Sequence, residues 1–158
     1  MSKAFTRESD DAGDAPLPAR PLALVPPGAK NYLTPDGAAR LREELAQLTA
    51  RPAPRPAGVE QRLAQLAECL RTAEVVPPPP PPWDAVRFGA TVTFREADGT
   101  EDTFRIVGAA EADPARDSVS WLAPVAKSLM NARLGERVRL RVPVGEREVE
   151  VTAIRYGE

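Results

Sequence analysis

The sequence predicts an α+β fold, in which a short antiparallel helical hairpin is followed by an antiparallel β-sheet domain with one short helix. Three observations lead to this prediction. Apolar residues recur every three or four positions between residues 38 and 73, and every second position after residue 83. An unbroken run of six prolines separates the two patterns. The predicted segments are a tail at 1–30, the hairpin at 31–76, a linker at 77–82 and the sheet domain at 83–158.

The composition restricts the kinds of function. The 158 residues include 18 prolines, one cysteine (Cys69) and no histidine, and the net charge is -2. Histidine catalysis, zinc sites and structural disulfides are therefore excluded or nearly so, and the basic charge of a free-standing nucleic-acid binder is missing. No apolar run approaches the roughly 20 residues of a membrane span. We expect a cytoplasmic protein that binds no cofactor and no membrane.

Residues 1–30 are expected to be a disordered tail. The segment mixes serine, aspartate, alanine and proline with little apolar periodicity, so it cannot bury enough surface to offset the entropy lost on ordering. Its acidic and basic residues balance, which argues against a nucleic-acid arm. A docking peptide stays open as an alternative.

The segment 31–76 is predicted to form the helical hairpin. Thr34 suits an N-cap and Pro35 suits the first helical position. The connection at 49–58 is short enough to make the two helices antiparallel, each about 20 to 25 Å long at 1.5 Å per residue. A plain helical pair that covers the next domain's core is the alternative. The two heptad patterns consist of Ala38, Leu41, Leu45 and Leu48, and of Val59, Leu63, Leu66, Leu70 and Ala73.

The six prolines at 77–82 cannot donate backbone hydrogen bonds. We expect a polyproline II spacer of roughly 19 Å at 3.1 Å per residue. A ligand for a proline-recognition module is the alternative.

The segment 83–158 alternates as β-strands do. Residues 90–94 and 104–106 flank a turn at 97–99 and predict one hairpin, and Pro124 opens a short helix. Residues 137–142 and 149–156 predict a second hairpin, with a bulge where the alternation slips near residue 153.

The charged clusters in the sequence give little indication of a catalytic site. The acidic pairs Glu43–Glu44 and Glu101–Asp102 are interpreted as solvated surface, and Cys69 has no partner that would activate it. Trp121 and Leu122 either form an exposed apolar interface or belong to the core. The basic residues Arg137, Arg139 and Arg141 share one strand face, and we expect Glu148 and Glu150 to neutralise them across the hairpin.

Three stretches resemble the Gre transcript-cleavage factors, and the GreB branch most closely. They read GAKNYLTPDGAARLREELAQL at 28–48, FGATVTFREADGTEDTFRIVGAAEAD at 88–113 and APVAKSLMNARLGERVRL at 123–140. The elements FGA, DG, F-x-IVG, an acidic loop, P-x-A and G-E-x-V recur in the order typical of the family. No single element is specific, but their order is.

The resemblance implies an N-terminal coiled coil and a C-terminal FKBP-like domain that docks on bacterial RNA polymerase at the secondary channel. Acidic residues at the tip of the family's coil help to hold a metal ion in the polymerase active site, where the polymerase itself cuts backtracked RNA. A member of the family is therefore an accessory factor and not an enzyme. We expect a monomer that meets nucleic acid only through the polymerase complex.

This sequence departs from the family pattern at the tip. No Asp or Glu lies between Glu44 and Glu60, where Arg51 and Arg55 are the only charged residues. Such a tip cannot ligate magnesium, which takes carboxylate oxygens, and the helices are about half the family's length. We expect a regulator that binds polymerase, competes with other channel-binding factors and does not stimulate cleavage. In its shortened helices and its lack of an acidic tip, the chain resembles the regulator of nucleoside diphosphate kinase.

The resemblance places docking at Pro124. Leu122 and Ala123 stand where the family usually has a polar residue and a serine. We assign no residue to catalysis or to a metal. The docking surface is assigned Trp121, Leu122, Pro124 and Lys127, and the hairpin tip Arg51 and Arg55.

Three other functions stay open. An active cleavage factor would draw its acids from Glu8, Asp10 and Asp11 of the tail, although a flexible tail positions carboxylates poorly. A generic protein-interaction module would use the helical hairpin to bind another helix. A prolyl isomerase would follow from the FKBP-like fold, but the chain has few aromatic residues for a proline pocket.

Overall fold

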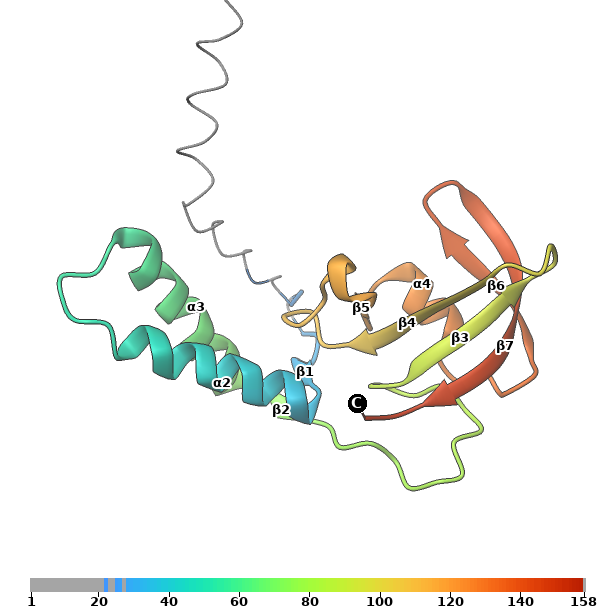
Figure 1. Cartoon of the computed structure of the whole chain (residues 1–158), viewed down its shortest axis with the longest axis horizontal. Coiled ribbons are helices and arrows are strands. Elements are labelled where there is room, and N and C mark those ends of the chain that lie inside the picture. The colour runs from blue at the N-terminus through green and yellow to red at the C-terminus, as the bar shows by residue number, and fades with distance from the viewer. Residues whose placement is uncertain (1–21, 23–24, 27, 158) are drawn as a thin grey trace, which may run out of the picture.

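The computed structural model describes residues 22, 25–26 and 28–157, so most of the predicted tail lies outside the described residues. A helical hairpin lies beside a five-stranded sheet with one short helix, which confirms the predicted α+β class (Figure 1). None of the described helices is long and apolar enough to cross a membrane.

Helices α2 (Pro35–Thr49) and α3 (Ala57–Thr72) form the hairpin. The hydroxyl of Thr34 caps α2 by accepting a hydrogen bond of 3.1 Å from the N–H of Gly37. The helices have 15 and 16 residues, so each is about 22 to 24 Å long at 1.5 Å per residue. Arg62 of α3 binds Glu44 of α2 at 2.7 and 3.0 Å and fastens the helices together. The hairpin's buried core consists of Leu33, Ala38, Leu41 and Leu66.

A small parallel sheet, which the sequence did not predict, closes the base of the hairpin. It pairs β1 (Tyr32–Leu33), just before α2, with β2 (Glu74–Val75), just after α3. The prolines at 77–82 that follow form neither helix nor strand. The indole N–H of Trp83 donates to the carbonyl of Pro79 at 3.0 Å, which ties the linker to the start of the sheet domain.

The large sheet has the strand order β5-β4-β3-β7-β6. Its neighbours pair antiparallel except β4 and β5, which are parallel. The prediction of a wholly antiparallel sheet was therefore wrong at this edge. The loop from Gly108 to Asp117, which contains the 3-10 helix η2 (Pro114–Arg116), brings the chain back level with Arg105 before β5 begins. The strands are β3 (Thr91–Glu96), β4 (Glu101–Val107), β5 (Ser118–Ser120), β6 (Arg137–Val142) and β7 (Gly145–Arg155).

One face of the large sheet carries the main core. The short helix α4 (Pro124–Leu129) buries Ala126 and Leu129 in this core, beside the inward side chains of the strands. The predicted bulge is present: Thr93 pairs with Ala153 and Phe94 pairs with Val151, so Thr152 is the extra residue of β7. The bulge returns the apolar side chains of β7 to the core side.

Candidate functional site

Three of the four predicted docking residues line one groove. Leu122, Pro124 and Lys127 border a groove of about 600 Å³ between α4 and the β6–β7 hairpin. The other residues that line this groove are Ser128, Arg139, Arg141 and Glu146. We call this surface the α4–β6 groove.

The turn before α4 presents Pro124 to solvent. After β5 ends, the N–H of Leu122 donates to the Ser120 hydroxyl at 3.1 Å, and the N–H of Ala123 donates to the Ser120 carbonyl at 2.9 Å. Pro124 then occupies the first turn of α4, where a missing N–H costs nothing. Pro124 and Lys127 are exposed and Leu122 is half-buried, so the groove combines apolar and basic contacts.

Trp121 does not line the α4–β6 groove. Its ring packs against the main core and lies 5.0 Å from the ring of Tyr32, at the base of the hairpin. Its indole Nε1 is buried without a hydrogen-bond partner among the described residues. Of the two positions that the sequence left open, core and exposed surface, Trp121 takes a half-buried one against the core.

The predicted neutralisation of the β6 arginines was largely wrong. The backbone register is as expected, with Arg139 opposite Glu148, but Glu148 lies 3.8 Å from Arg137 and Glu150 binds Arg95 of β3 at 3.1 Å. Within the described chain, no ion pair joins Arg139 or Arg141 to a carboxylate. Long guanidinium side chains reach diagonally as well as straight across a sheet, so register alone did not determine the pairing.

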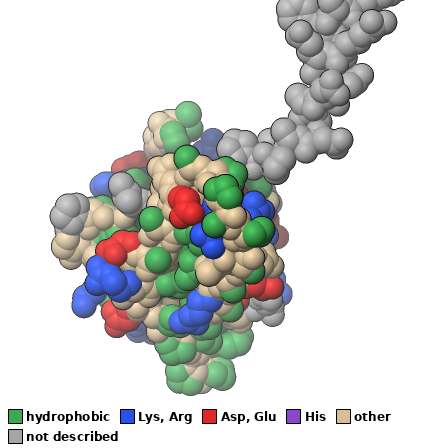
Figure 2. All heavy atoms as spheres, turned by 90° about the vertical axis from the view of Figure 1, so that its left-hand side faces the viewer, with side chains coloured by type: hydrophobic (Ala, Val, Ile, Leu, Met, Phe, Trp, Pro, Cys, Tyr) green, Lys and Arg blue, Asp and Glu red, His purple; other side chains and the backbone are tan. Residues whose placement is uncertain are grey.

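The tip of the hairpin spans residues 50–56, and Figure 2 views the molecule from this end. Arg55 donates to the carbonyls of Thr49 (2.8 Å) and Arg51 (3.0 Å), and it lies 3.3 Å from Glu60. Arg55 therefore satisfies carbonyls at the end of α2, while the Arg51 side chain is exposed. Basic, acidic and apolar side chains are interspersed on this face of the molecule (Figure 2).

Polar contacts join the hairpin to the sheet domain, and the sequence reasoning missed them. Arg105 of β4 donates two hydrogen bonds of 2.8 Å to the Asp36 carboxylate in the first turn of α2. Hydrogen bonds from Arg105 are the main cause that lowers the pKa of Asp36 to about 2. No signal in the sequence links these two residues, which lie 69 positions apart.

A second contact at this junction involves Glu111. Its carboxylate accepts hydrogen bonds from the N–H groups of Thr34 (2.8 Å) and Gly108 (3.0 Å) and from the Thr34 hydroxyl. A Cβ on Gly37 would lie 1.6 Å from the Glu111 carboxylate, so only glycine leaves room for this contact. The acidic loop of the sequence thus positions α2 against the sheet.

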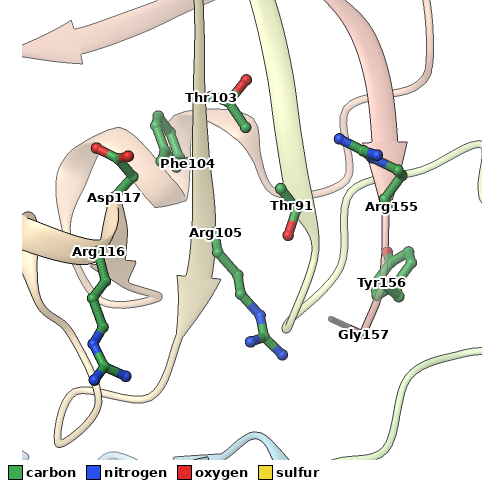
Figure 3. Close-up of a pocket in the computed structure, with 9 residues that line it drawn as sticks. All are labelled: Thr91, Thr103, Phe104, Arg105, Arg116, Asp117, Arg155, Tyr156 and Gly157. Carbon is green, nitrogen blue, oxygen red and sulfur yellow. The ribbon is translucent and has the colours of Figure 1, made fainter.

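A shallow pocket of about 460 Å³ lies elsewhere on the sheet domain. Figure 3 shows the Arg105 and Arg116 side chains extending from β4 and from the loop before β5, and Arg155 on β7. Arg105 is bound to Asp36 and Arg116 lies 4.0 Å from Asp113. Two of the three cations that line this pocket are thus paired within the chain, which makes the pocket a weaker candidate than the α4–β6 groove.

Possible metal ligands and the Cys69 thiol bear on what the described residues can do chemically. None of their His, Cys, Asp and Glu side chains form a group of three that could hold a metal ion. Burial raises the pKa of the Cys69 thiol, which favours the unreactive protonated form. Leu122, Pro124 and Lys127 are brought together, while the hairpin tip with Arg51 and Arg55 lies at the far end of the molecule (Figure 1).

Residues 80–156 match the family model described as "Transcription elongation factor, GreA/GreB, C-term". The protein named transcription elongation factor GreB from Neisseria meningitidis serogroup A is 34% identical over 154 residues, covering 80% of this chain and 94% of that protein. The protein named transcription elongation factor GreA from Bacillus cereus (strain AH187) is 40% identical over 98 residues, covering 61% of this chain and 62% of that protein.

Solved structures are similar as well. The structure titled as a prokaryotic transcription elongation factor GreA/GreB from Nitrosomonas europaea is 27% identical, with a TM-score of 0.44. The match covers 81% of this chain and 99% of that chain.

Proposed function

The chain belongs to the GreA/GreB family of transcription elongation factors, and from this membership we propose that it binds bacterial RNA polymerase at the entrance of the secondary channel without stimulating transcript cleavage. One observation carries the proposal. The similarity to GreB covers 80% of this chain, yet the tip of the hairpin has no carboxylate between Glu44 and Glu60.

The C-terminal domain supports the docking half of the proposal. Leu122, Pro124 and Lys127 all fall within the region that matches the family, and they border one groove. The Leu122 side chain, where the family usually has a polar residue, gives this contact a more apolar character. Docking at this groove leaves the hairpin free to point into the channel.

The tip supports the absence of cleavage stimulation. The residues there do not fit a divalent cation, because Arg51 and Arg55 are basic and the nearest carboxylate towards α3, that of Glu60, is paired with Arg55 at 3.3 Å. Helices of 15 and 16 residues also reach only about 22 to 24 Å at 1.5 Å per residue. A short, basic tip that stops before the active site occupies the channel entrance and excludes other factors.

Equilibrium binding tests the docking half of this proposal directly. The labelled native chain is titrated with bacterial core RNA polymerase, and an authentic cleavage factor is then added as competitor. We expect saturable binding that the competitor displaces. Binding that the competitor does not displace would move the site away from the channel, and no binding would favour a generic protein-interaction module.

A further inference from the structure

We propose that Lys127, Arg139 and Arg141 extend the docking surface into a basic groove that binds an acidic segment of the polymerase surface. This inference rests on the proposed function, since it names the chemistry of the partner at the same groove. It adds two residues of β6 that neither the family resemblance nor the sequence pattern assigned to docking.

Basic side chains from a helix and a strand converge on the α4–β6 groove. Lys127 comes from α4, and Arg139 and Arg141 come from β6, yet all three line one groove of about 600 Å³. The Ser128 hydroxyl of α4 accepts a hydrogen bond of 3.2 Å from the N–H of Arg141, so helix and strand are held together. The backbone positions from which the three charged side chains extend are therefore held in place.

Two of these basic side chains, Arg139 and Arg141, have no ion-pair partner within the described chain. The chain has a net charge of -2, and its neighbouring arginines are engaged: Arg137 lies 3.8 Å from Glu148 and Arg147 lies 2.9 Å from Glu96. Arg139 and Arg141 are exposed and form no ion pair within the described chain. A guanidinium presents donors in a fork that matches a carboxylate, so these two residues are suited to an external carboxylate.

The remaining lining of the groove favours a protein segment over a nucleic acid. Leu122 and Pro124 supply apolar surface beside the cations, and Glu146 places a negative charge in the same wall. A phosphate backbone carries a charge at every nucleotide and would leave the apolar surface of Leu122 and Pro124 without a partner. A peptide segment with one or two acidic residues next to an apolar side chain matches the whole lining.

The test compares charge reversals inside and outside the groove. Arg139→Glu and Arg141→Glu are each titrated against core RNA polymerase that holds no nucleic acid and, in parallel, against complexes with DNA and RNA. Arg155→Glu is the matched control, because Arg155 is exposed on β7, does not line the groove and changes the net charge by the same amount. Thermal unfolding of each variant checks the fold, and Arg139→Gln and Arg141→Gln replace any variant that unfolds.

We expect each groove variant to weaken binding by about five-fold or more and the control to stay within about two-fold of the native chain. Added salt should weaken the native complex more than the variant complexes. Binding by the native chain that neither variant changes would overturn the inference alone. A loss seen only on complexes with DNA and RNA would show a nucleic-acid partner instead, and absence of native binding would overturn the proposed function as well.

Discussion

The Arg105 guanidinium donates two hydrogen bonds of 2.8 Å to the Asp36 carboxylate, and this pair ties the sheet domain to the first turn of the helical hairpin. Both side chains are largely shielded from solvent, with 18% of Arg105 and 26% of Asp36 exposed. A bidentate pair of this kind fixes direction as well as distance. The pair therefore adds a directional polar contact to the apolar packing of Tyr32 on Trp121 between the hairpin and the sheet domain.

The first prediction concerns how the stability conferred by the Asp36–Arg105 pair depends on pH. The pKa of Asp36 is held at about 2, below its ordinary value of 3.8, chiefly by hydrogen bonds from Arg105. A lowered folded-state pKa means that this stabilisation is complete above about pH 4 and is lost as the pH falls towards 2. Asp36→Asn should therefore lower the free energy of unfolding by about 1 kcal/mol at pH 5, after allowance for solvent screening.

Urea unfolding of the native chain and Asp36→Asn at several pH values measures this effect. The difference between the two chains should shrink towards zero near pH 2. Asp102→Asn is the control, since Asp102 is exposed and makes no ion pair in the described chain. A difference for Asp36→Asn that does not change with pH would contradict the assigned role of the pair.

The second prediction concerns Gly37 and Gly58, which lie in the first turns of α2 and α3. Gly37→Ala places a methyl group 1.6 Å from the Glu111 carboxylate, so Glu111 must release the N–H groups of Thr34 and Gly108. We expect a loss of about 1 to 3 kcal/mol in the free energy of unfolding. Gly58→Ala is the matched control, because nothing lies within 4 Å of its added Cβ.

The same change from glycine to alanine should thus destabilise the protein at position 37 but not at position 58. Alanine has the higher helix propensity, so Gly58→Ala should be neutral or stabilising by up to about 1 kcal/mol. Thermal unfolding of both variants provides the measurement. Equal effects at the two positions would show that the contact between Glu111 and α2 does not constrain Gly37.

The third prediction separates the two tip arginines. Arg55→Ala removes hydrogen bonds to the carbonyls of Thr49 and Arg51 and should cost about 1 kcal/mol in the free energy of unfolding. Arg51→Ala should cost almost nothing, because the Arg51 side chain is exposed. Amide hydrogen exchange at the end of α2 should rise in Arg55→Ala only, and a rise in both variants would refute the capping role.

The fourth prediction tests the docking residues. Replacing Leu122 and Pro124 together with alanine should weaken binding to core RNA polymerase by about ten-fold, since both side chains supply apolar surface in the groove. The fold should persist, because neither residue belongs to the buried core. Leu134→Ala is the control, with a leucine that is 51% exposed outside the groove. Unchanged affinity of the double variant would argue against this docking site.

The local elements could be predicted because their causes are local. Thr34 and Pro35 mark the start of α2, and the heptad spacing of Leu41 and Leu66 marks the faces that pack. The bulge at Thr152 follows from a slip in the alternation of β7. Each of these depends on residues a few positions apart.

The long-range contacts could not be predicted from such patterns. The parallel pairing of β5 depends on the path of the loop from Gly108 to Asp117. Arg139 and Arg141 form no ion pair in the described part of the chain because Glu148 lies near Arg137 and Glu150 binds Arg95. Sequence spacing carries no information on such choices between side chains.

RNA length in stalled elongation complexes tests the central claim most directly. Complexes of bacterial RNA polymerase with labelled, backtracked RNA are incubated with saturating native protein, alone and together with an authentic cleavage factor. We predict no shortening of the RNA by this protein alone, and less shortening by the authentic factor as this protein is added. Shortening of the RNA by this protein alone would contradict the claim that it binds without stimulating cleavage, and undiminished shortening by the authentic factor would contradict its binding at the channel.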